Sequence, residues 1–97
     1  MIKNITTRAP RMIIIHWRQD MKNVNEMAYL INVTNVASKR LLRIGPELKL
    51  SNRLYNTEVK GLEPYAKYMV QIKACITTFC SQSSKPIYAF TREEGEN

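Results

Sequence analysis

The chain has few of the residues from which catalytic and metal sites are built. Its 97 residues include one histidine, one aspartate, three glycines and two cysteines. His16 has no carboxylate neighbour in the sequence, and no base accompanies the serines between positions 81 and 84. A zinc site needs four ligands, and the acidic residues are too scattered for a calcium loop. We therefore predict a protein that is not an enzyme, with no catalytic residue, no metal and no cofactor.

Long hydrophobic runs are also absent. The longest, residues 12–15, has the length of a strand and falls far short of the roughly 20 residues that a membrane helix requires. The first residues carry no apolar signal segment and no small-residue cleavage site. We expect no membrane insertion by this segment. If the protein is secreted, we expect the chain to be a piece of a longer precursor.

The length is that of one domain with a single core. The formal net charge is +7, and it is unevenly spread. All 15 basic residues but only five of the eight acidic ones precede Glu93, so the part up to Arg92 carries +10. Such a surface attracts anionic partners, although the same charge also serves solubility. Charge alone therefore names no partner.

Period-two alternation recurs in short segments separated by Asn, Gly, Pro and Ser, which is typical of a β-sandwich. Further strands are expected around residues 2–7, at 41–44 before a turn at Gly45-Pro46, and from Tyr68 onward. The alternation predicts that one side chain in two faces the core. In the four remaining strands the inward residues are Ile13, Ile15 and Trp17; Tyr29, Ile31 and Val33; Tyr55, Thr57 and Val59; and Pro86, Tyr88 and Phe90.

A corner between two strands is the most specific motif. Gly61 and Pro64 interrupt an extended run, and the spacing Leu-x-Pro-x-x-x-Tyr places Tyr68 at the first inward position of the next strand. From there the Tyr68 hydroxyl reaches back to an upstream backbone group, as in the tyrosine corner of Greek-key sandwiches. With Leu62, Pro64 and Tyr68 in these positions, the chain resembles the fibronectin type III family.

The resemblance extends over nearly the whole chain, because Trp17 and Tyr29 also have the expected order and spacing. It implies an all-β, seven-stranded Greek-key β-sandwich, fibronectin type III or immunoglobulin-like, over residues 1–92, followed by an acidic tail or linker at 93–97. A true immunoglobulin domain is disfavoured, since its tryptophan lies on the third strand and its cysteines are widely spaced. The family is a modular scaffold, so the resemblance implies a non-catalytic module.

The cysteines and two sequons bear on the compartment. By strand parity Cys75 points away from the core, and a hairpin between the sixth and seventh strands would bring Cys80 opposite it for a disulfide; the alternative is two reduced thiols. Asn4-Ile5-Thr6 and Asn32-Val33-Thr34 fit the glycosylation pattern. Together these features predict an extracellular or cell-surface ectodomain fragment. Similar cysteine pairs occur in some repeats of large sensory and receptor ectodomains.

Three hypotheses for the function remain, two that involve binding and a third that does not. In the first, loops at residues 18–26 and 75–84, at one end of the sandwich, recognise a protein partner through Phe79, Thr77 and Thr78. The alternative is that Phe79 folds back over the sandwich end. In the third, the domain is a passive spacer in a tandem array, with its tail as a linker.

The second hypothesis concerns a sulfated glycan such as heparan sulfate, bound by Lys39, Arg40 and Arg43. Other basic residues would join them in space: Lys22, Lys49 and Arg53. The alternative is a set of scattered, solvated charges. No nucleic-acid partner is expected, because basic residues do not interleave with exposed aromatics when nearly all aromatic rings are assigned inward.

Overall fold

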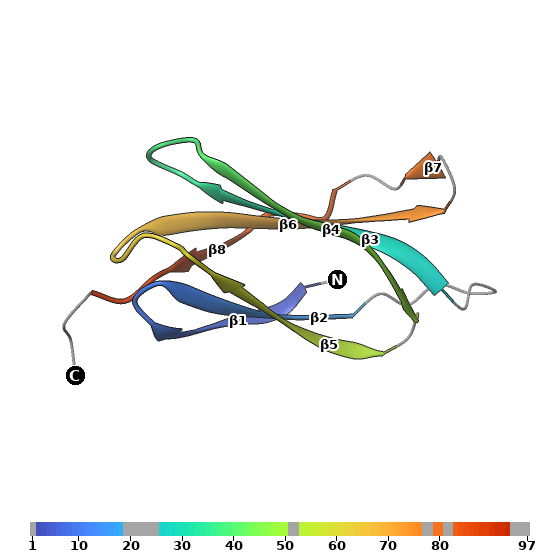
Figure 1. The fold of residues 1–97 in the computed structure, drawn as a ribbon, viewed down its shortest axis with the longest axis horizontal. Coiled ribbons are helices and arrows are strands. Elements are labelled where there is room, and N and C mark those ends of the chain that lie inside the picture. The colour runs from blue at the N-terminus through green and yellow to red at the C-terminus, as the bar shows by residue number, and fades with distance from the viewer. Residues whose placement is uncertain (1, 19–25, 51–52, 77–78, 81–82, 94–97) are drawn as a thin grey trace.

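A computed structural model describes residues 2–18, 26–50, 53–76, 79–80 and 83–93, and all of its regular elements are strands (Figure 1). No helix in these ranges has the length and hydropathy needed to cross a membrane. The strands are β1 (Ile2–Ala9), β2 (Met12–Arg18), β3 (Glu26–Asn35), β4 (Leu41–Leu50), β5 (Leu54–Lys60), β6 (Lys67–Ile76), β7 (Phe79–Cys80) and β8 (Ile87–Phe90).

The strands form two antiparallel sheets that face each other (Figure 1). One sheet has the order β1-β2-β5, and the other has the order β4-β3-β6-β7 with β8 also paired to β6. Between β7 and β8, Ser84 takes the place of a strand residue: its N–H donates to the Ile72 carbonyl at 2.8 Å, and its Oγ accepts the Ile72 N–H at 3.0 Å. β7 and β8 are therefore two parts of the predicted seventh strand, and the sandwich is confirmed.

The core lies between the inner faces, as the alternation predicts for every inward set except that of the last strand. β2 alternates strictly between half-buried and buried residues, and Ile13 and Ile15 are fully buried. The centroid of the Trp17 ring lies 4.7 Å from that of Tyr29 and 4.9 Å from that of Tyr55. The Trp17 Nε1 donates to Thr57 Oγ1 at 2.9 Å. One indole thus joins both sheets while its single polar group is satisfied.

The tyrosine corner is also confirmed. Tyr68 and Leu62 are buried, and the Tyr68 hydroxyl accepts the backbone N–H of Glu63 at 2.8 Å. Thr91, which was not predicted from the sequence, also forms hydrogen bonds at this corner. Its Oγ1 donates to the Glu63 carbonyl at 2.7 Å and accepts the Ala66 N–H at 2.9 Å. The turn at residues 61–66 is therefore held from both β6 and the end of β8.

The predicted orientation of the last strand is wrong. Tyr88 and Phe90 are 51% and 57% exposed, whereas Ala89 between them is buried. The register explains this, because Ala89 lies opposite the inward-facing Tyr68 and so faces the core itself, while its two neighbours in β8 face the other way. The large aromatic residues of β8 consequently face solvent.

The predicted turn at Gly45-Pro46 is wrong as well. β4 continues through it from Leu41 to Leu50, and the register on β3 shifts between Tyr29 and Ile31, which marks a β-bulge. Gly45 has φ +93°, and an added Cβ would lie 2.5 Å from the Tyr29 carbonyl oxygen. Pro46 is tolerated because β4 is an edge strand, where a missing N–H breaks fewer ladder bonds.

The sandwich has two ends with different loops and turns. The corner end holds the β1–β2 turn, the β3–β4 turn at residues 36–40 and the β5–β6 corner; the Leu62 N–H donates to the Arg11 carbonyl at 3.1 Å, and the Val36 N–H donates to the Lys67 carbonyl at 2.9 Å. The hairpin end holds the β6–β7 hairpin, labelled at the opposite side of Figure 1.

Candidate functional site

The hairpin end is built around a disulfide. Cys75 and Cys80 are direct cross-strand partners of β6 and β7, with Cα atoms 4.0 Å apart, and their sulfurs are bonded at 2.02 Å. The predicted pairing is confirmed, and no described cysteine is free. The bridge closes a hairpin of which the tip, Thr77 and Thr78, lies outside the described residues.

The predicted protein-binding residue Phe79 is described only in its backbone, which pairs with Ile76 in β7. Its side chain lies outside what the structure describes, so both of its predicted orientations stay predictions. The strand ends beside the two predicted loops do meet, because Ala28 near the start of β3 is the partner of Cys75 near the end of β6. Residues 19–25 of the first loop lie outside the described residues.

The basic residues Lys39, Arg40 and Arg43 lie at the corner end, away from the disulfide, and all three are exposed. Among the described residues, the ion pairs are Lys49 with Glu47 at 3.6 Å and Lys60 with Glu58 at 3.8 Å, so none of the three cations takes part in these pairs.

Other basic residues do not join this group. Lys49 is six residues beyond Arg43 on the same extended strand, about 20 Å away at the usual rise. Its Nζ lies 5.4 Å from the Tyr55 ring centroid, at the other end of β4. Arg53 follows after β4, and Lys22 lies outside the described residues. The structure therefore does not assemble the larger predicted cluster, and glycan binding by Lys39, Arg40 and Arg43 stays a prediction.

The turn that presents Lys39 and Arg40 is organised by Asn35, which sequence reasoning missed. Asn35 is 4% exposed, and its Oδ1 accepts the N–H groups of Ala37 and Ser38 at 3.0 and 3.1 Å. Its Nδ2 lies 3.4 Å from the Tyr68 hydroxyl and 3.4 Å from Glu63 Oε2. A buried Asn before a turn is a recognisable signal, because its side chain bonds to the following backbone. Here it connects the basic turn to the corner.

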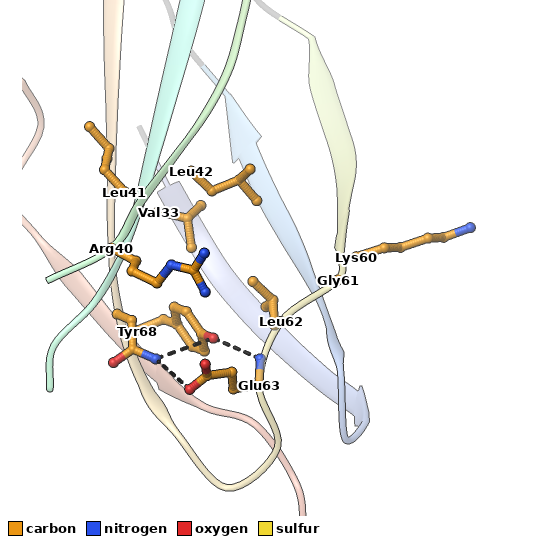
Figure 2. A pocket seen from close by; sticks show the side chains of 10 residues that line it. Val33, Arg40, Leu41, Leu42, Lys60, Gly61, Leu62, Glu63 and Tyr68 are labelled. Carbon is orange, nitrogen blue, oxygen red and sulfur yellow. Dashed lines mark hydrogen bonds between the residues drawn. The ribbon is translucent and has the colours of Figure 1, made fainter. Parts of the chain in front are cut away.

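A cavity of about 260 Å³ opens beside this connection (Figure 2). Arg40 extends over Tyr68 toward Leu62, whereas Lys60 points away into solvent. The Glu63 carboxylate lies in the same cavity, so the lining offers one cation and one anion (Figure 2). This arrangement suits a small polar group of mixed charge better than an isolated sulfate, because Glu63 opposes a purely anionic ligand.

The two predicted glycosylation residues differ in access. Asn4 is exposed on β1, whereas Asn32 faces outward from the middle of the five-stranded sheet and is half-buried. The Asn32 Oδ1 atom is buried and makes no hydrogen bond within the described part of the chain. Use of either sequon stays a prediction, and the exposures favour Asn4.

His16 is a structural residue of the three-stranded sheet. Its Nε2 lies 2.9 Å from Thr6 Oγ1 and its Nδ1 lies 2.7 Å from Asn56 Oδ1, so the ring connects β1, β2 and β5. Across the described residues, no group of three or more His, Cys, Asp or Glu side chains lies close enough together to hold a metal ion.

No protein-family model matches the sequence. The chain is 30% identical to human usherin over 80 residues, which are 82% of this chain and 1% of usherin. It is 28% identical to mouse usherin over 86 residues, 89% of this chain and 2% of that protein. The chain thus spans a very small part of the relatives that it matches.

Solved structures give the fold. The FN1–FN3 segment of chicken CNTN1 matches with a TM-score of 0.75 at 20% identity, over 93% of this chain and 30% of that one. The fn3 domain of human contactin 1 matches with a TM-score of 0.74 at 21% identity, over 96% of this chain and 76% of that one. The sixth fibronectin type III domain of a human protein, fibronectin type III domain containing protein 3, matches with a TM-score of 0.70 at 18% identity, over 97% and 84%. The chain therefore has the fibronectin type III fold.

Proposed function

We propose that this chain is a non-catalytic extracellular binding module of a cell-surface receptor or adhesion protein, and that it recognises a protein partner through the loops at the hairpin end. The Cys75–Cys80 disulfide carries the proposal. Disulfides persist in oxidising compartments and are rare in the cytosol. The bridge also fixes the base of the hairpin, so a side chain at its tip loses less conformational freedom when a partner binds.

Two further observations support the compartment. Usherin and contactin, among the proteins that this chain resembles, are extracellular or cell-surface proteins. One predicted glycosylation residue, Asn4, is exposed on an edge strand where a glycan meets no packed neighbour. The expected result is that the domain secreted from a eukaryotic cell carries a glycan on Asn4, and that Asn4→Gln removes the mass shift on enzymatic deglycosylation while Asn32→Gln leaves it.

The binding site is tested with the domain tetramerised and applied to adherent cells. The variant Thr77→Ala, Thr78→Ala, Phe79→Ala should reduce cell-surface staining about tenfold, since an aromatic hot spot contributes above 1 kcal/mol. Tyr65→Ala is the matched control, because Tyr65 is an exposed aromatic at the opposite end of the sandwich. Staining that persists in the triple variant removes the hairpin as the site. Absence of staining on every cell type favours the spacer role, with residues 93–97 as a linker.

Binding of a sulfated glycan is the second candidate, favoured by the exposure of Lys39 and Arg40 on a turn that Asn35 fixes and of Arg43 on the strand that follows. On immobilised heparin the wild type should elute at higher salt than a variant with all three changed to Ser. Elution of the wild type below about 0.15 M salt, the physiological ionic strength, would end this candidate. The Glu63 carboxylate beside Arg40 works against it, so we rank it second.

A further inference from the structure

Exposed apolar side chains are concentrated on one face of this domain. Eight large apolar residues of the described ranges are exposed. By register and alternation, five of them lie on the outer face of the five-stranded sheet: Leu41, Leu48, Leu50, Tyr88 and Phe90. An apolar surface gathered on one sheet face, rather than scattered singly, marks an interaction surface.

The register places three of these residues, Leu41, Tyr88 and Phe90, in one continuous band, whereas Leu48 and Leu50 lie toward the hairpin end of the same face. Leu41 pairs with Thr34, Thr34 with Met69, and Met69 with Tyr88, so one row crosses all four neighbouring strands. Phe90 lies one step further along β8, opposite Lys67. At usual strand spacings the outer face is about 14 Å across these four strands, and β6 runs about 27 Å along it from Lys67 to Cys75.

Around Tyr88 and Phe90, the described charges on this face are basic. Its charged residues, among the side chains that the structure describes, are Lys67, Lys73 and Arg43. The Lys67 ammonium lies 4.8 Å from the Tyr88 ring centroid and 6.0 Å from that of Phe90. The contact holds the ammonium over the rings and gives the aromatic surface a positive charge.

We infer that this outer face, centred on Lys67, Tyr88 and Phe90, docks an acidic protein surface that carries apolar or aromatic side chains. Charge complementarity selects the acidic partner, because three cations and no described anion surround the band. The aromatic residues select a protein over a sulfated glycan, because a glycan offers the exposed rings little to pack against. Even the whole face of about 14 by 27 Å is roughly half of the 800 Å² per partner in a standard interface, so binding through it alone is of the weak, transient class.

This surface does not depend on the loop site at the hairpin end. Tyr88 and Phe90 belong to β8 and lie near the corner end, whereas Phe79 belongs to β7 beyond Ser84. Loss of one site by mutation therefore leaves the other intact, and each can be tested separately. The two surfaces share only the sheet on which they are built.

The test uses a random copolymer of glutamate and tyrosine as an acidic, aromatic probe, with polyglutamate, heparin and oligothymidine as polyanion controls. Binding to the isotopically labelled domain is followed by amide shifts and by titration. The variant Tyr88→Ser, Phe90→Ser should bind the copolymer at least tenfold more weakly, and Lys67→Glu should do the same while Lys67→Arg retains binding. Tyr65→Ser and Lys3→Glu are the matched controls, since both positions are exposed and lie off this face.

The expected shifts map to β6 and β8, and the Phe79→Ser variant should bind the copolymer as the wild type does. Equal affinity of the Tyr88→Ser, Phe90→Ser variant and the wild type overturns the inference. The inference is also overturned if polyglutamate or heparin binds as tightly as the copolymer, because charge alone then suffices. It is overturned as well if oligothymidine binds more tightly than the copolymer and loses this affinity in the Tyr88→Ser, Phe90→Ser variant. Loss of cell staining in the hairpin variant bears only on the loop site.

Discussion

Replacing Tyr68 by Phe tests the corner with a change of one oxygen atom. The ring stays and the packing is preserved, but the Glu63 N–H loses the acceptor that it had at 2.8 Å. The Asn35 amide loses a contact at 3.4 Å at the same time. A net hydrogen bond contributes about 1 kcal/mol, and a buried donor left without a partner costs about 1–3 kcal/mol. We expect the free energy of unfolding to fall by about 1–2 kcal/mol.

Urea and thermal denaturation measure this change. For a domain of this size, 1 kcal/mol corresponds to about 4–8 °C in Tm. Tyr65→Phe is the control, because that side chain is 71% exposed and the loss of its hydroxyl should change stability by less than about 0.5 kcal/mol. Equal midpoints for the two variants, at unchanged m-values, would refute the assignment of the Tyr68 hydroxyl to the corner.

Three further changes probe other parts of the fold. Replacing Cys75 and Cys80 by Ser should destabilise the domain by about 2 kcal/mol in the chain-entropy model. The intact mass of the wild type, but not of this variant, should increase by two hydrogen atoms when reductant is added. Free thiols in a secreted preparation would contradict the bridge. Gly45→Ala should destabilise by more than Gly61→Ala in urea denaturation, because both have positive φ but only the first meets a backbone oxygen; equal losses would contradict the close approach. Thr91→Val should cost about 1–3 kcal/mol by leaving a corner N–H and C=O unpaired, and an unchanged Tm would remove Thr91 from the corner.

The sequence predicted the inner faces well where burial alternates along a strand. Ile13 and Ile15, and Val70 and Ile72, are buried at every second position, and no partner strand needs to be known to find them. The corner could also be predicted from the sequence, because Leu62 and Tyr68 have a characteristic spacing and the tyrosine hydroxyl of such a corner bonds to an upstream backbone group.

The orientation of β8 was not readable in this way. Its strongest apolar alternation, Tyr88 and Phe90, points to solvent because the register with β6 puts Ala89 against Tyr68. That choice depends on the pairing with β6, and a single strand's pattern does not contain it. The same error concealed the aromatic face, since rings assigned to the core were not considered for binding.

The dispersal of the basic residues has a similar cause. The pair Gly45-Pro46 reads locally as a turn, and a turn would have folded Lys49 back toward Arg43. The bulge instead lets β4 continue along β3, so the two side chains are separated by most of a strand. A bulge depends on the neighbouring strand, which local sequence does not describe.

The ties at the end of β8 have a mechanical consequence. β1 begins opposite Trp17 near the hairpin end, and the chain leaves β8 at the corner end, where Thr91 bonds to the corner and Arg92 Nε donates to the Thr7 carbonyl at 2.9 Å. Tension between these two points acts along the strands, while ladder bonds run across them. The hydrogen bonds of β1 with β2 and of β8 with β6 would therefore be loaded in shear and break together, instead of opening one at a time. A force applied from the carboxyl side would act first on the hydrogen bonds of Thr91 and Arg92 at the corner.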